Sequence, residues 1–196
     1  MGQACPGTIR PVPRIYTRTG DDGTTGLLYG KRVPKDHPLI DANGVVDEAQ
    51  AVIGVARAEL ERGSELDTLL VEIERSLWVL MSEIATPGED RHKLEAKKSL
   101  VTEDMVTELE RYIDDFKERS EVPADFVVPG QDRLSALLDQ ARTVVRRAER
   151  LVVALTLPEG SFVGPYLNRL SDLLFTLARW QEGSHEMSRQ GKRRKS

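Results

Sequence analysis

The 196-residue chain is expected to be an all-α protein, a five-helix bundle with a long glycine-rich N-terminal loop. From residue 45 onward, apolar residues recur every three or four positions, which is the spacing of one face of an α-helix. No segment shows the alternation of apolar and polar residues that indicates a half-buried strand. Five amphipathic segments with short connections are typical of a helical bundle.

Each helix is predicted from its apolar spacing and its end signals. The first ends at Gly63 and the second before Pro87, both residues that interrupt a helix. Thr102 is expected to cap the third helix, and Pro165 suits the first turn of the fifth. The apolar spacing places the five helices at approximately residues 45–60, 66–84, 102–116, 131–157 and 165–177.

The composition divides the chain into three parts. Residues 1–14 are rich in proline and glycine and are expected to be a flexible N-terminus, followed by a helical-bundle domain at 15–184. Residues 185–196 are expected to be a basic, flexible tail. Because the net charge is −4 despite this tail, the folded body is acidic, and no nucleic-acid partner is expected.

Neither a membrane association nor a secretory route is expected. No apolar run reaches the ~18 residues of a membrane span, and the first residues lack the regions of a signal peptide. Cys5 is the only cysteine, which excludes an internal disulfide and fits a reducing cytoplasm. The spacing shows no zinc-ligand set and no Ser-His-Asp constellation. If the chain is an enzyme, its nucleophile is therefore not expected to be a side chain.

The glycine-rich loop YTRTGDDGTTGLLYGK is one candidate for ligand binding. Glycines let a backbone approach a ligand closely, and successive amides can bind phosphate oxygens. The loop lacks the spacing of a Walker A motif, since Lys31 is followed by Arg32 and not by Ser or Thr. An ordinary turn-rich connection is an equally open interpretation of this segment.

The stretch ARTVVRRAER in the fourth helix is the second candidate. At helical spacing, Arg142, Arg146 and Glu149 form one stripe that borders the apolar face. Two guanidiniums one turn apart repel each other unless an anion lies between them, and arginine suits phosphate. The alternative is a solvated face laced with Glu–Arg pairs.

Three further motifs have simpler alternatives. The two acids of VDEA at 46–49 would lie in the first turn of a helix, where the helix dipole favours negative charge. Asn168, Asp172 and Arg179 share a polar stripe on the fifth helix, which local pairing could explain. Phe126 precedes a Pro-Gly turn, where an aromatic side chain usually packs.

Taken together, YTRTGDDGTT, the KDHP segment, VDEA, FVVPG, ARTVVRRAER and YLNRLSDLLF resemble, in order and spacing, the PduO-type ATP:cob(I)alamin adenosyltransferases, from about residue 15 to 181. The resemblance implies a homotrimer of five-helix bundles with ATP bound between subunits. It implies that the cobalt of cob(I)alamin attacks C5′ of ATP, forming adenosylcobalamin and releasing triphosphate. A cobalamin reductase and an adenosylcobalamin-dependent mutase would be partners.

The resemblance also implies roles for individual residues. Arg146 would contact the phosphates, Glu149 would lie near ATP and its Mg²⁺, and Asn168 would contact the nucleoside. The glycine-rich loop would wrap the triphosphate with Thr17, Arg18, Gly20, Asp21, Thr24, Thr25 and Lys35.

On the other side of the site, Asp47 would pair with Arg142 of the neighbouring subunit, and Phe126 would lie on the corrinoid side. The chain departs from the usual family pattern at Gln131, where a small residue is common, and at Asp139, where histidine is common. These departures concern the corrinoid side more than the ATP side.

Two other functions fit parts of the sequence. The first is a non-catalytic corrinoid carrier of the same fold, and the second is a helical interaction protein that uses its arginine stripe on an acidic partner. The second does not account for the glycine-rich loop, and turnover of ATP to triphosphate separates the enzyme from both.

Overall fold

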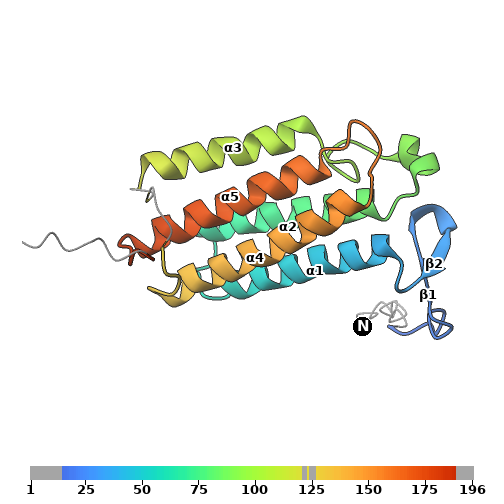
Figure 1. The fold of residues 1–196 in the computed structure, drawn as a ribbon, viewed down its shortest axis with the longest axis horizontal. Helices are drawn as coiled ribbons and strands as arrows, with labels where there is room; N and C mark the ends of the chain where they lie inside the picture. Colours follow the sequence, from blue (N-terminus) through green and yellow to red (C-terminus); the bar gives the residue numbers. More distant parts are fainter. Residues whose placement is uncertain (1–14, 121–122, 124–126, 189–196) are drawn as a thin grey trace, which may run out of the picture.

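The structure is a computed structural model that describes residues 15–120, 123 and 127–188. Within these residues, five long helices lie side by side as a bundle, and a small hairpin projects beyond one end (Figure 1). This confirms the predicted fold class. The helices are α1 (Pro38–Arg57), α2 (Glu65–Ile84), α3 (Glu103–Glu118), α4 (Arg133–Ala154) and α5 (Val163–Glu182).

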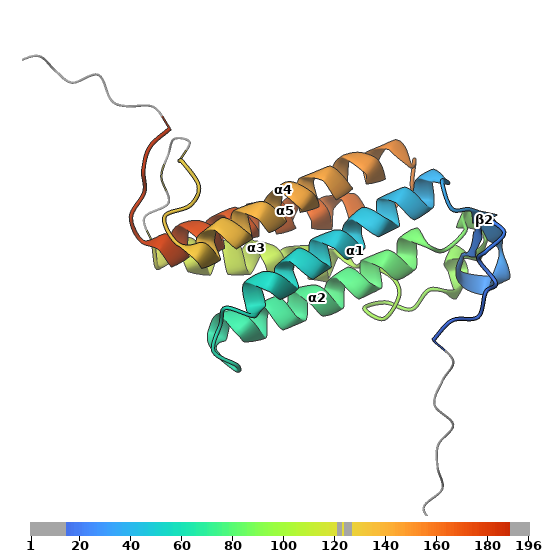
Figure 2. The ribbon, with the colours of Figure 1, turned by 90° about the horizontal axis from the view of Figure 1, so that it is seen from below.

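Helix α4 lies between α1 and α5. It packs against α1 and α5, while α3 packs against α5 and α2 against α1. Figure 2, seen from below, shows α1 and α2 side by side. The apolar face of α4 carries Leu138, Val145 and Val152, all buried in a single core. The polar side chains that border this face therefore lie along the contacts with α1 and α5. In the described part of the chain, no helix is long and apolar enough to cross a membrane.

Polar side chains cap three of the helices. The hydroxyl of Ser64 accepts a hydrogen bond from the third residue of α2, and Asp132 forms a capping box with Ser135 at the start of α4. At α1 the ring of His37 accepts from a backbone N–H. The prediction that Thr102 caps α3 is correct for its position but wrong for its side chain, which makes no capping hydrogen bond.

The long glycine-rich segment that is expected to be a loop contains regular structure. β1 (Thr24–Gly26) pairs antiparallel with β2 (Arg32–Pro34), around a short 3₁₀ turn η1 (Leu28–Gly30). Strands of three residues are too short to show an alternation of apolar and polar residues, so they cannot be predicted from hydrophobic spacing. A second 3₁₀ turn, η2 (Gly88–Lys93), lies in the connection between α2 and α3.

Helix α1 also begins earlier than predicted, at Pro38. Asn43 and Gly44, which are poor helix formers, concealed its first turns. The early start moves Asp47 to approximately the third turn of the helix. The interpretation that Asp47 complements the helix dipole is therefore wrong, because that effect is confined to the first turn.

Candidate functional site

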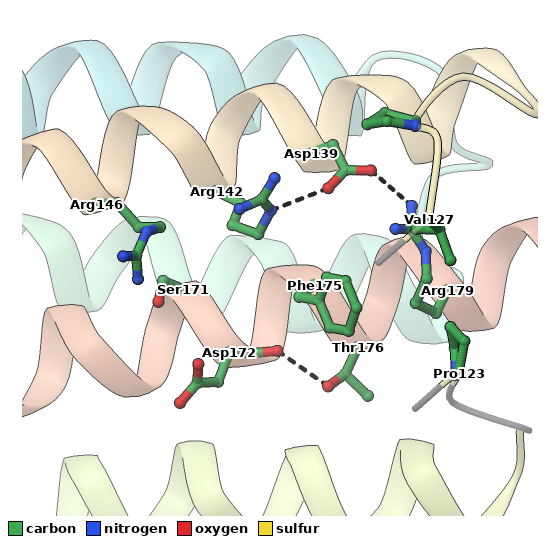
Figure 3. A pocket seen from close by; sticks show the side chains of 11 residues that line it. Pro123, Val127, Asp139, Arg142, Arg146, Ser171, Asp172, Phe175, Thr176 and Arg179 are labelled. Carbon is green, nitrogen blue, oxygen red and sulfur yellow. Dashed lines mark hydrogen bonds and ion pairs between the residues drawn. The ribbon is translucent and has the colours of Figure 1, made fainter. Parts of the chain in front are cut away.

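A pocket of about 580 Å³ lies between α4 and α5 (Figure 3). This volume is within the range of small-molecule sites, which is about 300–1,000 Å³. One wall is charged and another is apolar, the latter including Val127, Pro129 and Phe175. The full lining comprises Pro123, Val127, Pro129, Asp139, Arg142, Arg146, Ser171, Asp172, Phe175, Thr176 and Arg179.

The predicted arginine stripe borders this pocket. Arg142 and Arg146, one turn apart on α4, both line it. Nε of Arg142 donates to Oδ1 of Asp139 at 2.9 Å, whereas Arg146 is exposed and forms no ion pair with the residues that the structure describes. Arg147 points elsewhere and pairs with Glu48 of α1. The alternative interpretation, in which this helix face is solvated and its arginines pair with nearby glutamates, therefore does not hold for Arg146.

A buried ion pair closes one end of the pocket. The side chain of Arg179 on α5 is only 1% exposed, and its Nη2 donates to Oδ2 of Asp139 at 2.6 Å. Glu182 approaches the same guanidinium. The local pairing that a polar stripe on α5 predicts for Arg179 is therefore present with Glu182, but the second partner, Asp139, lies 40 residues away on another helix. Periodicity carries no signal for that contact.

Glu149 and Asn168 are brought together across α4 and α5. Nδ2 of Asn168 donates to Oε1 of Glu149 at 3.0 Å, and Arg169 donates to Oδ1 of Asn168 at 2.6 Å. Arg169 is held in turn by Glu110 of α3. Nearby, burial raises the pKa of Asp172 above its usual value, while Arg169 and Arg146 act in the opposite direction.

Arg32 organises the glycine-rich loop, a role that nothing in the sequence pattern indicates. Its Nη2 donates to the backbone oxygen of Thr19 at 2.6 Å and to the hydroxyl of Thr24 at 2.6 Å. Asp22 accepts from the backbone N–H of Thr24 at 2.9 Å and from its hydroxyl at 2.8 Å. These bonds hold the loop compactly against β2.

The other predicted loop residues surround this centre. Gly20 lies so close to Lys35 that an added Cβ would be 3.3 Å from Nζ of the lysine. Thr17 shares a hydroxyl hydrogen bond with Thr19, and Arg18 has a φ of 61°, in the left-handed region. Asp21 is exposed beside them and Thr25 pairs with Val33 in the hairpin. The candidate phosphate donors are thus gathered in one place.

Within one chain, the loop and the pocket are not brought together. The loop lies beyond the end of the bundle where α1 begins and α4 ends (Figure 1). It contacts the end of α2 and the turn η2, through Leu28 with Ala85 and Lys31 with Glu89. The pocket instead extends from the middle of α4 toward its first turns, as its lining residues Arg146 to Asp139 show.

Two predicted residues remain apart from these groups. Asp47 is exposed on α1 and makes no ion pair with any residue in the ranges 15–120, 123 and 127–188. Phe126 lies outside the described residues, although its neighbour Val127 lines the pocket. Val127 also bridges to Met187, so the segment after α5 runs back along this wall.

The chain matches the model of the cobalamin adenosyltransferase family over residues 15–181. It is 41% identical over 171 residues to the corrinoid adenosyltransferase of Citrobacter freundii, covering 86% of this chain and 95% of the relative. The chain belongs to the PduO-type corrinoid adenosyltransferases. As a corrinoid adenosyltransferase, it is a transferase.

Two further proteins support this family assignment of the adenosyltransferase. The human corrinoid adenosyltransferase is 36% identical over 181 residues, covering 89% of this chain and 72% of the relative. A phenylalanine-to-alanine variant of the PduO-type ATP:corrinoid adenosyltransferase from Lactobacillus reuteri, complexed with cobalamin and ATP, superposes with a TM-score of 0.80. It is 29% identical and covers 90% of this chain and 100% of its own.

Proposed function

We propose that the pocket between α4 and α5 receives the corrinoid and that Arg142 and Arg146 at its edge hold the triphosphate of ATP. The chain is an ATP:corrinoid adenosyltransferase, which transfers the 5′-deoxyadenosyl group of ATP to the cobalt of cob(I)alamin and releases triphosphate. The observation that supports our assignment is that two guanidiniums from one helix face line a pocket with an apolar wall. The cobalt is the nucleophile, so the protein acts by positioning its substrates and by stabilising charge.

Arg146 is the residue that we assign to the leaving triphosphate. Negative charge builds up on the phosphate chain as the bond to C5′ breaks, and a guanidinium offers paired donors to phosphate oxygens. Arg146 is exposed at the pocket edge and unpaired among the described residues, so it loses no existing ion pair when it binds phosphate. Phe126, beside the pocket-lining Val127, would act on the corrinoid side.

The ATP site is shared between subunits in this proposal. In a single chain, the loop with Thr24 and Lys35 lies against the end of α2, away from the arginines of α4. A neighbouring chain in a cyclic homotrimer would bring its own loop to the stripe. Asp47, exposed on α1, would then pair with Arg142 across the interface. The loop residues that would wrap the triphosphate are Thr17, Arg18, Gly20, Asp21, Thr24, Thr25 and Lys35.

Mg²⁺ would enter with ATP. Among the described residues, no group of three or more His, Cys, Asp or Glu side chains could hold a metal ion by itself. Mg²⁺ is commonly bound by substrate phosphates together with only one or two carboxylates. Glu149 suits this role because Asn168 orients its carboxylate through only one of its two oxygens in the described structure. Asn168 would contact the nucleoside from the same position.

The test is an anaerobic assay with magnesium-ATP and chemically reduced cobalamin. The expected result is a visible spectrum of the cobalt–carbon product, with one triphosphate released per product. Arg146→Ala and Arg142→Gln should both slow product formation. Wild-type rates in both variants would refute the assignment of this pocket edge to ATP.

A further inference from the structure

One buried carboxylate lies between two guanidiniums at the end of the pocket. Oδ1 of Asp139 accepts from Nε of Arg142 at 2.9 Å, and Oδ2 accepts from Nη2 of Arg179 at 2.6 Å (Figure 3). The side chain of Asp139 is 5% exposed and that of Arg179 is 1% exposed, whereas that of Arg142 is 26% exposed. Both carboxylate oxygens are thus engaged, and of these three side chains Arg142 is the most exposed to the open part of the site.

We propose that Asp139 is a positioning residue that holds Arg142 in the orientation needed for ATP. The proposal rests on the proposed function, in which Arg142 belongs to the ATP site. Because Asp139 binds Nε, the two terminal nitrogens of Arg142 are left for the triphosphate or a neighbouring subunit. An arginine side chain with several rotatable bonds is held at both ends of its stem, by its backbone in α4 and by this bond.

Arg179 fixes Asp139 in its turn. The guanidinium of Arg179, on α5, is buried and is bound by two carboxylates. Its Nη2 lies 2.6 Å from Oδ2 of Asp139 and 3.2 Å from Oε2 of Glu182. The cluster contains the guanidiniums of Arg142 and Arg179 and two carboxylates, and the ring of His185 lies 2.8 Å from Oε1 of Glu182. A buried carboxylate with both oxygens engaged cannot rotate without leaving a charge unpaired, which is costly. The orientation of Arg142 therefore follows from that of the buried pair.

A purely structural role is the competing explanation, in which Asp139 only neutralises Arg179. Glu182 allows the two to be separated, because it also binds Arg179 but has no contact with Arg142 in the described structure. Removing the charge of either carboxylate leaves the buried guanidinium of Arg179 with only one anionic partner. Only removing Asp139 releases Nε of Arg142. Glu182→Gln is therefore a matched control for stability.

The experiment is a double-mutant cycle on kcat and on KM for ATP, using full-length Asp139→Asn, Arg142→Gln and the combined variant. We expect Asp139→Asn to lower kcat/KM for ATP by about 10- to 100-fold, the range for misplaced catalytic groups. In the Arg142→Gln background, the same change should cost less than about threefold, because coupled residues are not additive. Glu182→Gln should stay within about threefold of the wild type while its melting temperature falls.

Each outcome decides the matter. Equal effects of Asp139→Asn with and without Arg142, or an equal kinetic loss in Glu182→Gln, would show a structural role and overturn the proposal. If circular dichroism shows that Asp139→Asn does not fold, the cycle is run with Asp139→Glu, which keeps the charge but shifts the carboxylate by one methylene. Wild-type kinetics of Arg142→Gln would instead refute the assignment of Arg142, and the positioning role with it.

Discussion

The side chains of Glu149 and Asn168 meet across α4 and α5, with 3.0 Å between Oε1 of the glutamate and Nδ2 of the asparagine. Arg169 binds the other end of the Asn168 amide, at 2.6 Å, and is held by Glu110 of α3. The amide is therefore oriented with its nitrogen toward Glu149. Three helices thus determine how this carboxylate is presented at the site.

We expect Asn168→Asp to weaken ATP binding. The change replaces a donor with a second carboxylate beside Glu149, and like charges at this distance disfavour ionisation of both. A lost hydrogen bond to a charged group is worth about 1.5–3 kcal/mol, or roughly one to two decades in KM for ATP. Steady-state kinetics measure the effect. Gln140→Glu, an added charge at an exposed position of α4, is the control and should leave KM unchanged.

Arg146→Ala should lower kcat more than it raises KM. Charge on the triphosphate grows as it leaves, so a guanidinium that stabilises it contributes mainly in the transition state. The expected loss is about one to two decades, from a charge-assisted contact of about 1.5–3 kcal/mol. Arg150→Ala, one turn further on the same helix and equally exposed, should behave as the wild type. Equal losses in the two variants would show a general effect of surface charge.

Asp67 should make the stability of the α1–α2 connection depend on pH. The backbone N–H of Gly63, at 2.8 Å, and the guanidinium of Arg57 lower the pKa of this carboxyl. A lowered pKa in the folded state stabilises the fold above the unfolded pKa, about 3.9, and the gain is lost as pH falls through the folded pKa. Asp67→Asn should therefore melt below the wild type at pH 7, and the difference should shrink at pH 3 and below.

Thermal melts followed by circular dichroism check this sign. Glu61→Gln is the control, since Glu61 is an exposed acid in the same connection with no ion pair among the described residues. A difference between Asp67→Asn and the wild type that stays constant down to pH 2 would mean that ionisation of Asp67 does not contribute.

The helices were predictable because their signal is local. The spacing of Leu66 to Ile84 alone gives α2 almost to the residue, and the same spacing placed Arg142 and Arg146 on one face. The start of α1 was not predictable from apolar spacing, because Asn43 and Gly44 interrupt the pattern while the packing of α1 against α4 stabilises it.

The contacts that shape the site were predictable only in part. The bond between Asp139 and Arg142 is within one turn of helix and could have been found from spacing. The bond between Asp139 and Arg179 depends on how α4 packs on α5, and the two residues are 40 positions apart. Arg32 is a similar case, since its bonds to Thr19 and Thr24 require the hairpin. One sequence contains no record of such tertiary contacts.

Asp47 and Arg142 should be coupled across the proposed subunit interface. The helix dipole does not account for Asp47, which is roughly in the third turn of α1, so Asp47→Asn should not destabilise an isolated subunit. Because Asp139 still neutralises Arg142, the expected coupling is about 0.5–3 kcal/mol, less than for a stranded charge. A double-mutant cycle on KM for ATP, with trimer dissociation followed by sedimentation, measures it. Additive effects would mean that the pair is not formed.

A mixed assembly gives the sharpest test of the proposed homotrimer with sites shared between subunits. Lys35→Ala disables the loop of a chain, and Arg146→Ala disables its arginine stripe, so each homotrimer should be nearly inactive. The two variants are co-expressed with different affinity tags and purified through both tags, which selects trimers that contain both chains.

In such a trimer, each proposed site is formed by the loop of one chain and the arginine stripe of the next. A site is intact only where its loop comes from an Arg146→Ala chain and its stripe comes from a Lys35→Ala chain. For a cyclic trimer with two chains of one kind and one of the other, this arrangement occurs at one site in three, so the specific activity should recover to about one-third of the wild type. A site contained within one chain would recover nothing, because every chain carries one disabled part. The recovery therefore separates the two arrangements without requiring any subunit to be stable alone. Activity no higher than that of the separate variants, in trimers verified by sedimentation, would place the loop and the arginines of each site in the same chain.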